Sequence, residues 1–115
     1  MDPVMVKNEL EGDTLVLTLS VDHLDAGNSN LFRAQATPLI QSAKKVLLDL
    51  SGVNFIDSAG LGALLSAMRN LGERGGDFRV CSVAKPVRVL FELVRLHKVL
   101  DIHENRAEAL AANRA

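Results

Sequence analysis

The stretch Asp49-Leu-Ser-Gly-Val-Asn-Phe-Ile-Asp-Ser-Ala-Gly-Leu-Gly, residues 49–62, decides the fold of this chain. It overlaps the short apolar run 46–50, which is typical of a central strand covered on both faces. Asp57 and Ser58 then precede apolar residues at helical spacing, which predicts a helix that starts here and ends at Gly75-Gly76. The stretch is therefore read as a buried strand, a short loop and the first turn of a helix.

The predicted helix carries two unusual residues in its first turn, Gly60 and Gly62. A glycine inside a helix costs about 1 kcal/mol relative to alanine. The pair therefore indicates that something approaches this backbone closely, either the protein's own sheet or a partner surface. One face of the helix is predicted to enter the core, and polar residues are expected to stay exposed on the rest. The core face comprises Leu61, Leu64, Leu65, Met68 and Leu71, and the exposed residues are Ser66, Arg69 and Asn70.

Upstream, residues 14–20 alternate between two faces and predict a strand. A weaker strand around Val4 and Val6 should pair with it through the turn at Glu11-Gly12-Asp13. A helix is expected over 28–43. Pro38 lies inside that helix, where proline removes a backbone hydrogen bond, so a kink or a break is expected there.

Downstream, residues 78–83 predict a further strand, and Pro86 suits the first turn of a third helix. A short strand over 99–103 and a closing helix over 104–114 complete the chain. Since strands and helices alternate after an opening hairpin, we expect an α/β fold. It should have a mixed central sheet of about four to five strands with about four helices packed on it.

The composition narrows the classes of function. The 115 residues suit one domain, 1–115, and carry 13 basic and 14 acidic side chains with no basic block, which argues against nucleic-acid binding. No run approaches the roughly 20 apolar residues of a membrane helix. Cys81 lies in an apolar segment, where a buried, inert thiol is expected. A lone cysteine agrees with a reducing, cytoplasmic location.

Ser58 has two readings. Either it or Asp57 caps the helix, or its hydroxyl is exposed and available for phosphorylation. A phosphate at a helix start would be tolerated by the fold, because free N–H groups and the helix dipole favour negative charge there. It would add up to about two negative charges beside Asp57, on a surface that a partner must cover.

The run Phe55-Ile-Asp-Ser-Ala-Gly-Leu-Gly, following Asp49-Leu50-Ser51, resembles the signature of the STAS family, the anti-sigma factor antagonists. The resemblance extends over nearly the whole chain, including Leu24-Asp25, and identifies 1–115 as a single STAS-like domain. It implies that Ser58 is phosphorylated by an anti-sigma factor that is also a serine kinase. The unphosphorylated form would bind that kinase, and a phosphoserine phosphatase would restore it. The implied partner-binding residues are Asp25, Asp57, Ser58, Ala59, Gly60, Leu61 and Gly62.

Asp22-His23 departs from the family pattern, which often has a glycine before the Leu-Asp pair, so this loop is expected to be shaped differently. The same turn also occurs in STAS subunits of lipid-transporting ABC complexes, and in partner switches with targets other than transcription. These two alternatives stay open, and the sequence does not set the oligomeric state.

Catalytic readings are weaker. The surroundings of Ser58 are not Gly-x-Ser-x-Gly, so we expect no enzyme and no catalytic residue. The group His97, Asp101 and His103 straddles a predicted change of element, so no metal site is expected. Gly60-Leu61-Gly62 lacks the third glycine of a dinucleotide fingerprint, and no cofactor is expected.

Overall fold

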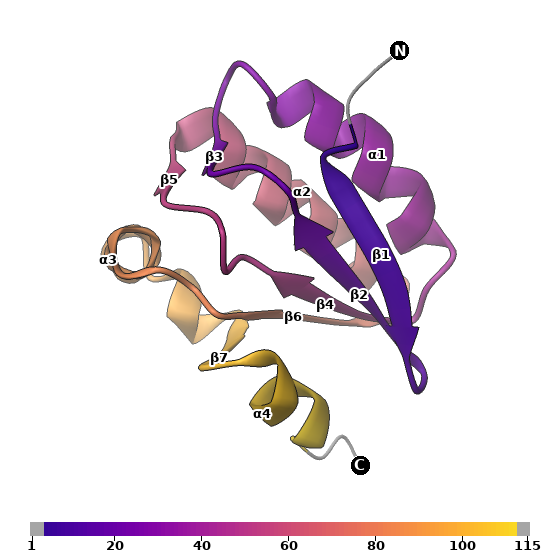
Figure 1. Cartoon of the computed structure of the whole chain (residues 1–115). Coiled ribbons are helices and arrows are strands. Elements are labelled where there is room, and N and C mark those ends of the chain that lie inside the picture. The colour runs from indigo at the N-terminus through magenta and orange to yellow at the C-terminus, as the bar shows by residue number, and fades with distance from the viewer. Residues whose placement is uncertain (1–3, 113–115) are drawn as a thin grey trace.

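A five-stranded sheet with the order β1-β2-β4-β6-β7 forms the centre of the molecule (Figure 1). The computed structural model describes residues 4–112. The hairpin pair β1–β2 is antiparallel and the other three pairings are parallel, so the sheet is mixed, as predicted. The strands of this sheet are β1 (Val6–Glu11), β2 (Thr14–Leu19), β4 (Lys45–Asp49), β6 (Asp77–Cys81) and β7 (Asp101–His103).

Two long helices cover one face of the sheet, and a short one covers the other (Figure 1). Helices α1 and α2 pack against each other over the larger core. Side chains of β2 point alternately to the two faces of the sheet and so contribute to the packing on both. Leu15 and Leu17 enter the larger core, while Val16 faces the smaller cluster beneath α4. The helices are α1 (Ser29–Gln41), α2 (Ser58–Glu73), α3 (Lys85–Leu93), the 3₁₀ helix η1 (Leu96–Lys98) and α4 (Arg106–Ala111).

Arg106 ties α4 to three strands of the sheet. Its guanidinium donates to Glu9 at 2.8 Å, to Thr18 at 3.2 Å and to Asp49 at 3.0 Å. Burial alone would raise the pKa of Asp49, but the Ser51 hydrogen bonds and Arg106 together hold it below its usual value. Cys81 lies buried in the same layer, where burial raises the pKa of its thiol and makes it a poor nucleophile.

A kink or a break was expected at Pro38; there is no break, since α1 continues through Pro38 to Gln41. Pro38 is exposed, and so is Ala34, whose carbonyl loses its helical donor to the proline. Because Ala34 is exposed, solvent can replace the missing hydrogen bond. A surface position thus makes an interior proline tolerable.

A second, two-stranded parallel sheet was not predicted from the sequence. It pairs β3 (His23–Leu24) with β5 (Phe55–Ile56) and sits immediately before α2. The predicted strand over 99–103 is shortened to β7, because the amides of Val99 and Leu100 donate back to the Leu96 carbonyl of η1. Helix α4 ends at Ala111, and the last expected helical position, Arg114, lies outside the described residues. No helix in the described part of the chain combines the length and apolar character needed to cross a bilayer.

Candidate functional site

Asp57 is the N-terminal cap of helix α2. Of the two candidate capping residues, Asp57 and Ser58, it is therefore Asp57 that caps the helix. Its Oδ1 accepts the amide of Gly60 at 2.9 Å, and its Oδ2 accepts the amide of Ala26 at 3.1 Å. The Gly60 amide is the main cause that lowers the pKa of Asp57, so this carboxylate is ionised at neutral pH. Asp57 therefore both caps the helix and holds the neighbouring loop.

Ser58 is the first residue of α2 and is exposed. Within residues 4–112, its hydroxyl makes no hydrogen bond, because Asp57 already does the capping. A phosphoryl group added to this oxygen would therefore displace no native interaction. The geometry leaves the Ser58 hydroxyl free for chemistry or for a partner.

The two glycines of the first turn differ in what surrounds them. A Cβ on Gly60 would lie 2.1 Å from the carbonyl oxygen of Leu24, so α2 packs directly on the β3 backbone there. A Cβ on Gly62 would meet only Arg33, at 3.9 Å. Gly60 is thus required by the protein's own structure. Gly62 has no such internal requirement, and it is half-buried.

The loop that holds Asp25 is built by short-range hydrogen bonds. Asp25 Oδ1 accepts the amide of Gly27 at 2.9 Å, and Asn28 accepts the amide of Asp25 at 2.9 Å. The Ala26 amide joins this loop to Asp57, so the structure brings Asp25 and the start of α2 together. Ala59 and Leu61 are half-buried on the first turn, and Leu61 packs against the core.

His23, at the position where the family often has glycine, needs no unusual backbone. Among the described residues, positive φ values occur at Gly12, Gly75, Ser82 and Arg95, and not at His23. Its Nδ1 lies 2.7 Å from Asp22 Oδ1, and this hydrogen bond is the main cause that raises the pKa of His23. The backbone at position 23 therefore does not require glycine.

Phe55 is a neighbour of the site that the sequence reasoning did not single out. It lies on β5, three residues before Ser58, and its side chain is 56% exposed. Helix α3 contacts β5 and exposes the apolar side chains Val89 and Leu93, and Val94 is exposed at its C-terminal cap. Exposed large apolar residues beside a free hydroxyl are typical of a binding surface.

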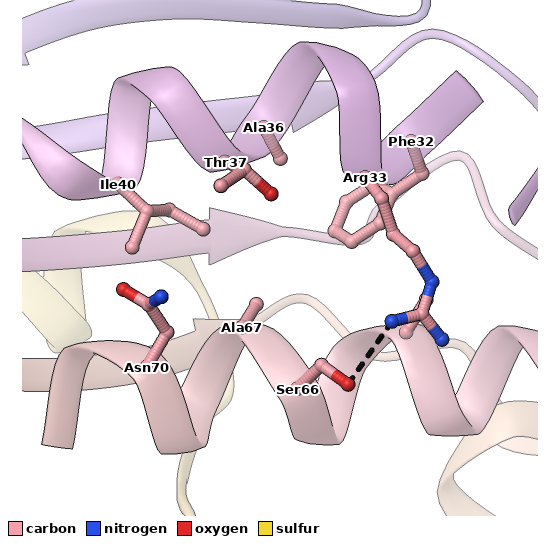
Figure 2. Close-up of a pocket in the computed structure, with 9 residues that line it drawn as sticks. Phe32, Arg33, Ala36, Thr37, Ile40, Ser66, Ala67 and Asn70 are labelled. Carbon is pink, nitrogen blue, oxygen red and sulfur yellow. Dashed lines mark hydrogen bonds between the residues drawn. The ribbon is translucent and has the colours of Figure 1, made fainter. Parts of the chain in front are cut away.

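The prediction that Ser66 and Asn70 are simply exposed is wrong. Both are half-buried and face α1 across a cavity of about 120 Å³, shown in Figure 2. Arg33 Nη1 donates to Ser66 Oγ at 3.1 Å, and Asn70 Oδ1 is buried with no hydrogen-bond partner among the described residues. Arg69 is exposed, as predicted.

His97, Asp101 and His103, the group considered as a metal site, do not share a common set of neighbours. His103 Nε2 lies 3.0 Å from Arg79 Nη1, and Asp101 forms an ion pair with Arg79 at 3.5 Å. His97 is exposed on η1. No group of three His, Cys, Asp or Glu side chains is arranged as metal ligands within the described residues.

The chain is similar in sequence and in structure to known proteins. The model of the STAS domain family matches residues 5–109. The anti-sigma F factor antagonist of Paenibacillus polymyxa is 31% identical over 109 residues, covering 93% of this chain and 92% of the relative. A solved anti-sigma factor antagonist from Mycobacterium paratuberculosis has a TM-score of 0.85 at 23% identity, covering 96% of this chain and 93% of that one. The Bacillus cell fate determinant SpoIIAA in its phosphorylated form has a TM-score of 0.70 at 22% identity, covering 91% and 96%.

Proposed function

Because the chain belongs to the STAS domain family, we propose that it is an anti-sigma factor antagonist that acts by partner switching. An anti-sigma serine kinase binds the domain while Ser58 carries a free hydroxyl and releases it once Ser58 is phosphorylated. A phosphoserine phosphatase then returns the domain to its binding form. In this role the protein regulates by binding and catalyses no reaction itself.

The observation that carries the proposal is that Asp57, and not Ser58, caps helix α2. Asp57 supplies the cap, and the Ser58 hydroxyl is exposed with no partner among residues 4–112. Phosphorylation can therefore change the surface while leaving the helix start intact. A solved structural neighbour, SpoIIAA, is described in its phosphorylated form, which agrees with such chemistry on this fold.

The strength of the switch follows from charge. Phosphoserine carries about −1.5 to −2 charges at pH 7, and here it stands beside the ionised Asp57. Like charges placed in an interface cost several kcal/mol, and each 1.4 kcal/mol is about tenfold in affinity. One phosphate can thus weaken a docked complex by a hundredfold or more.

The proposed docking surface comprises the first turn of α2 and the loop beside it. Gly62 leaves the partner room to approach, while Ala59 and Leu61 offer apolar contact. Asp25 lies on the adjoining loop, and Phe55 extends the surface with a large exposed ring. Phenylalanine, like the other aromatic residues, is enriched at protein–protein interfaces.

Affinity capture from the native lysate tests the proposal, with wild type, Ser58→Ala and Ser58→Asp as baits. We expect a kinase-like ATPase to bind the first two and not the third. The captured kinase should also transfer phosphate from ATP to wild type but not to Ser58→Ala. Asn8→Asp, which adds one charge on exposed β1, is the control and should bind like wild type.

Capture of an ABC-type ATPase equally by all baits would refute the switch and favour the transport-subunit alternative. If the kinase is captured but its other client is not a sigma factor, the switch stands with a different target.

A further inference from the structure

We propose that Arg33, on helix α1, receives the phosphate carried by Ser58 and becomes its counter-ion within the domain. This inference rests on the proposed function, because it concerns the phosphorylated state of Ser58. Arg33 has no part in the signature residues and belongs to a different helix. It would couple the modified residue on α2 directly to α1.

A stripe of small residues on α2 points to this pairing. Ser58, Gly62 and Ser66 are spaced four residues apart, so they lie above one another on the same face of the helix. Arg33 lies against that stripe: Nη1 donates to Ser66 Oγ at 3.1 Å, and Nη2 would be 3.9 Å from a Cβ on Gly62. Its guanidinium thus already contacts two of the three positions.

The direction of the helices places Arg33 toward the start of α2. In Figure 2, Arg33 lies beside Ser66 at one end of the interface, and Ile40 lies beside Asn70 at the other. The two helices therefore run in the same direction. In Figure 2 the Arg33 guanidinium lies on the side of Ser66 away from Asn70, which is the N-terminal side of α2, and its Nη2 is the atom that lies 3.9 Å from the Gly62 position.

The reach can be bounded from these distances. Side chains four residues apart on a helix have Cβ atoms about 6 Å apart, so Arg33 Nη2, at 3.9 Å from the Gly62 position, lies within about 10 Å of Ser58 Cβ. The phosphoryl oxygens project three bonds beyond that Cβ. Gly62 has no side chain to obstruct the path, and a rotamer change of an exposed arginine closes the remaining gap.

Little opposes this movement. Arg33 is exposed and gives up one surface hydrogen bond, to Ser66, for a charge-assisted contact with phosphate, which an arginine fork can make in a bidentate way. Asp57, next to Ser58, and Asp25, on the adjoining loop, are both acidic residues that repel the phosphate, which adds to the advantage of a cation. Phosphorylation would then change the surface twice, since it adds negative charge and withdraws the positive charge of Arg33 from a partner.

The test uses the full chain with phosphoserine incorporated at position 58 during translation, so no kinase is needed. Titration by ³¹P NMR gives the second pKa of the phosphate, which is ordinarily about 6. A cation in direct contact lowers this pKa, and Arg33→Ala should raise it by about half a unit or more. Arg33→Lys should keep most of the lowering, because it keeps the charge.

Arg69→Ala is the matched control. Arg69 is an exposed arginine on α2, three turns beyond Ser58, and its removal should move the phosphate pKa by less than about 0.2 unit because salt screens distant charges. Equal phosphate pKa values in wild type and Arg33→Ala would overturn the inference. That result would leave the proposed function standing if phosphoserine still abolished kinase capture. Unchanged kinase capture would instead refute the proposed function, whatever the pKa.

Discussion

Replacing Gly60 by alanine should destabilise the domain through a clash with a neighbouring backbone. The added Cβ would lie 2.1 Å from the Leu24 carbonyl oxygen and 2.7 Å from its carbon, so α2 and β3 must separate. Separation threatens the hydrogen bond from the Asp57 amide to Leu24, now 3.2 Å, at a cost of about 1 kcal/mol. Overpacking adds about 1–3 kcal/mol, and the helix propensity of alanine returns about 1 kcal/mol. The net loss should be about 1–3 kcal/mol.

Urea unfolding at pH 7 measures this loss, and the same helix supplies two control variants. In Gly62→Ala and Gly72→Ala the added Cβ would lie no closer than 3.9 Å to a neighbouring atom. Both variants should therefore stabilise the domain by up to about 1 kcal/mol. The opposite signs separate a clash at position 60 from a general effect of alanine in α2. A Gly60→Ala variant as stable as the Gly62→Ala variant would refute the reasoning.

Two further predictions concern the sheet and the surface. Arg106→Ala should lower the free energy of unfolding at pH 7 by about 1–3 kcal/mol, because it leaves the buried Asp49 carboxylate without its cation. Because the pKa of Asp49 is depressed in the fold, its contribution is present above the unfolded value of about 3.9 and is lost as the pH falls through the folded value. The difference from wild type should therefore shrink at pH 3, and a difference unaffected by pH would contradict this role. Phe55→Ala should change the unfolding free energy by no more than about 0.5 kcal/mol, yet weaken kinase binding at least about tenfold in a titration. Leu10→Ala, at an exposed residue on β1, is its control, and equal affinities for both variants would exclude Phe55 from the interface.

The sequence predicts the main sheet and helices well because their signals are periodic. The alternation over 14–19 and the apolar spacing in α2 each specify one buried face, and the structure places them accordingly. The pair β3 and β5 was missed because strands of two residues have no period to detect. A break at Pro38 was expected but is absent, because the cost of the proline depends on whether the carbonyl of Ala34 meets water, which is a property of the folded surface.

The residues of the candidate site could be predicted from the sequence, but the role of each residue could not. The sequence places Asp57, Ser58 and the two glycines together, but it does not tell which residue caps the helix. That distinction depends on atom positions, since Asp57 is the side chain that reaches the Gly60 amide. Arg33 gave no sequence signal, because its relation to α2 arises only when the two helices pack side by side.

The free hydroxyl at position 58 also bears on how such a domain can change over evolution. Since Asp57 alone starts the helix, a substitution of Ser58 by another small residue breaks no hydrogen bond among the described residues. Selection for folding therefore places little constraint on this position. A lineage could gain or lose regulation here by a single substitution, while the scaffold and its binding surface persist unchanged.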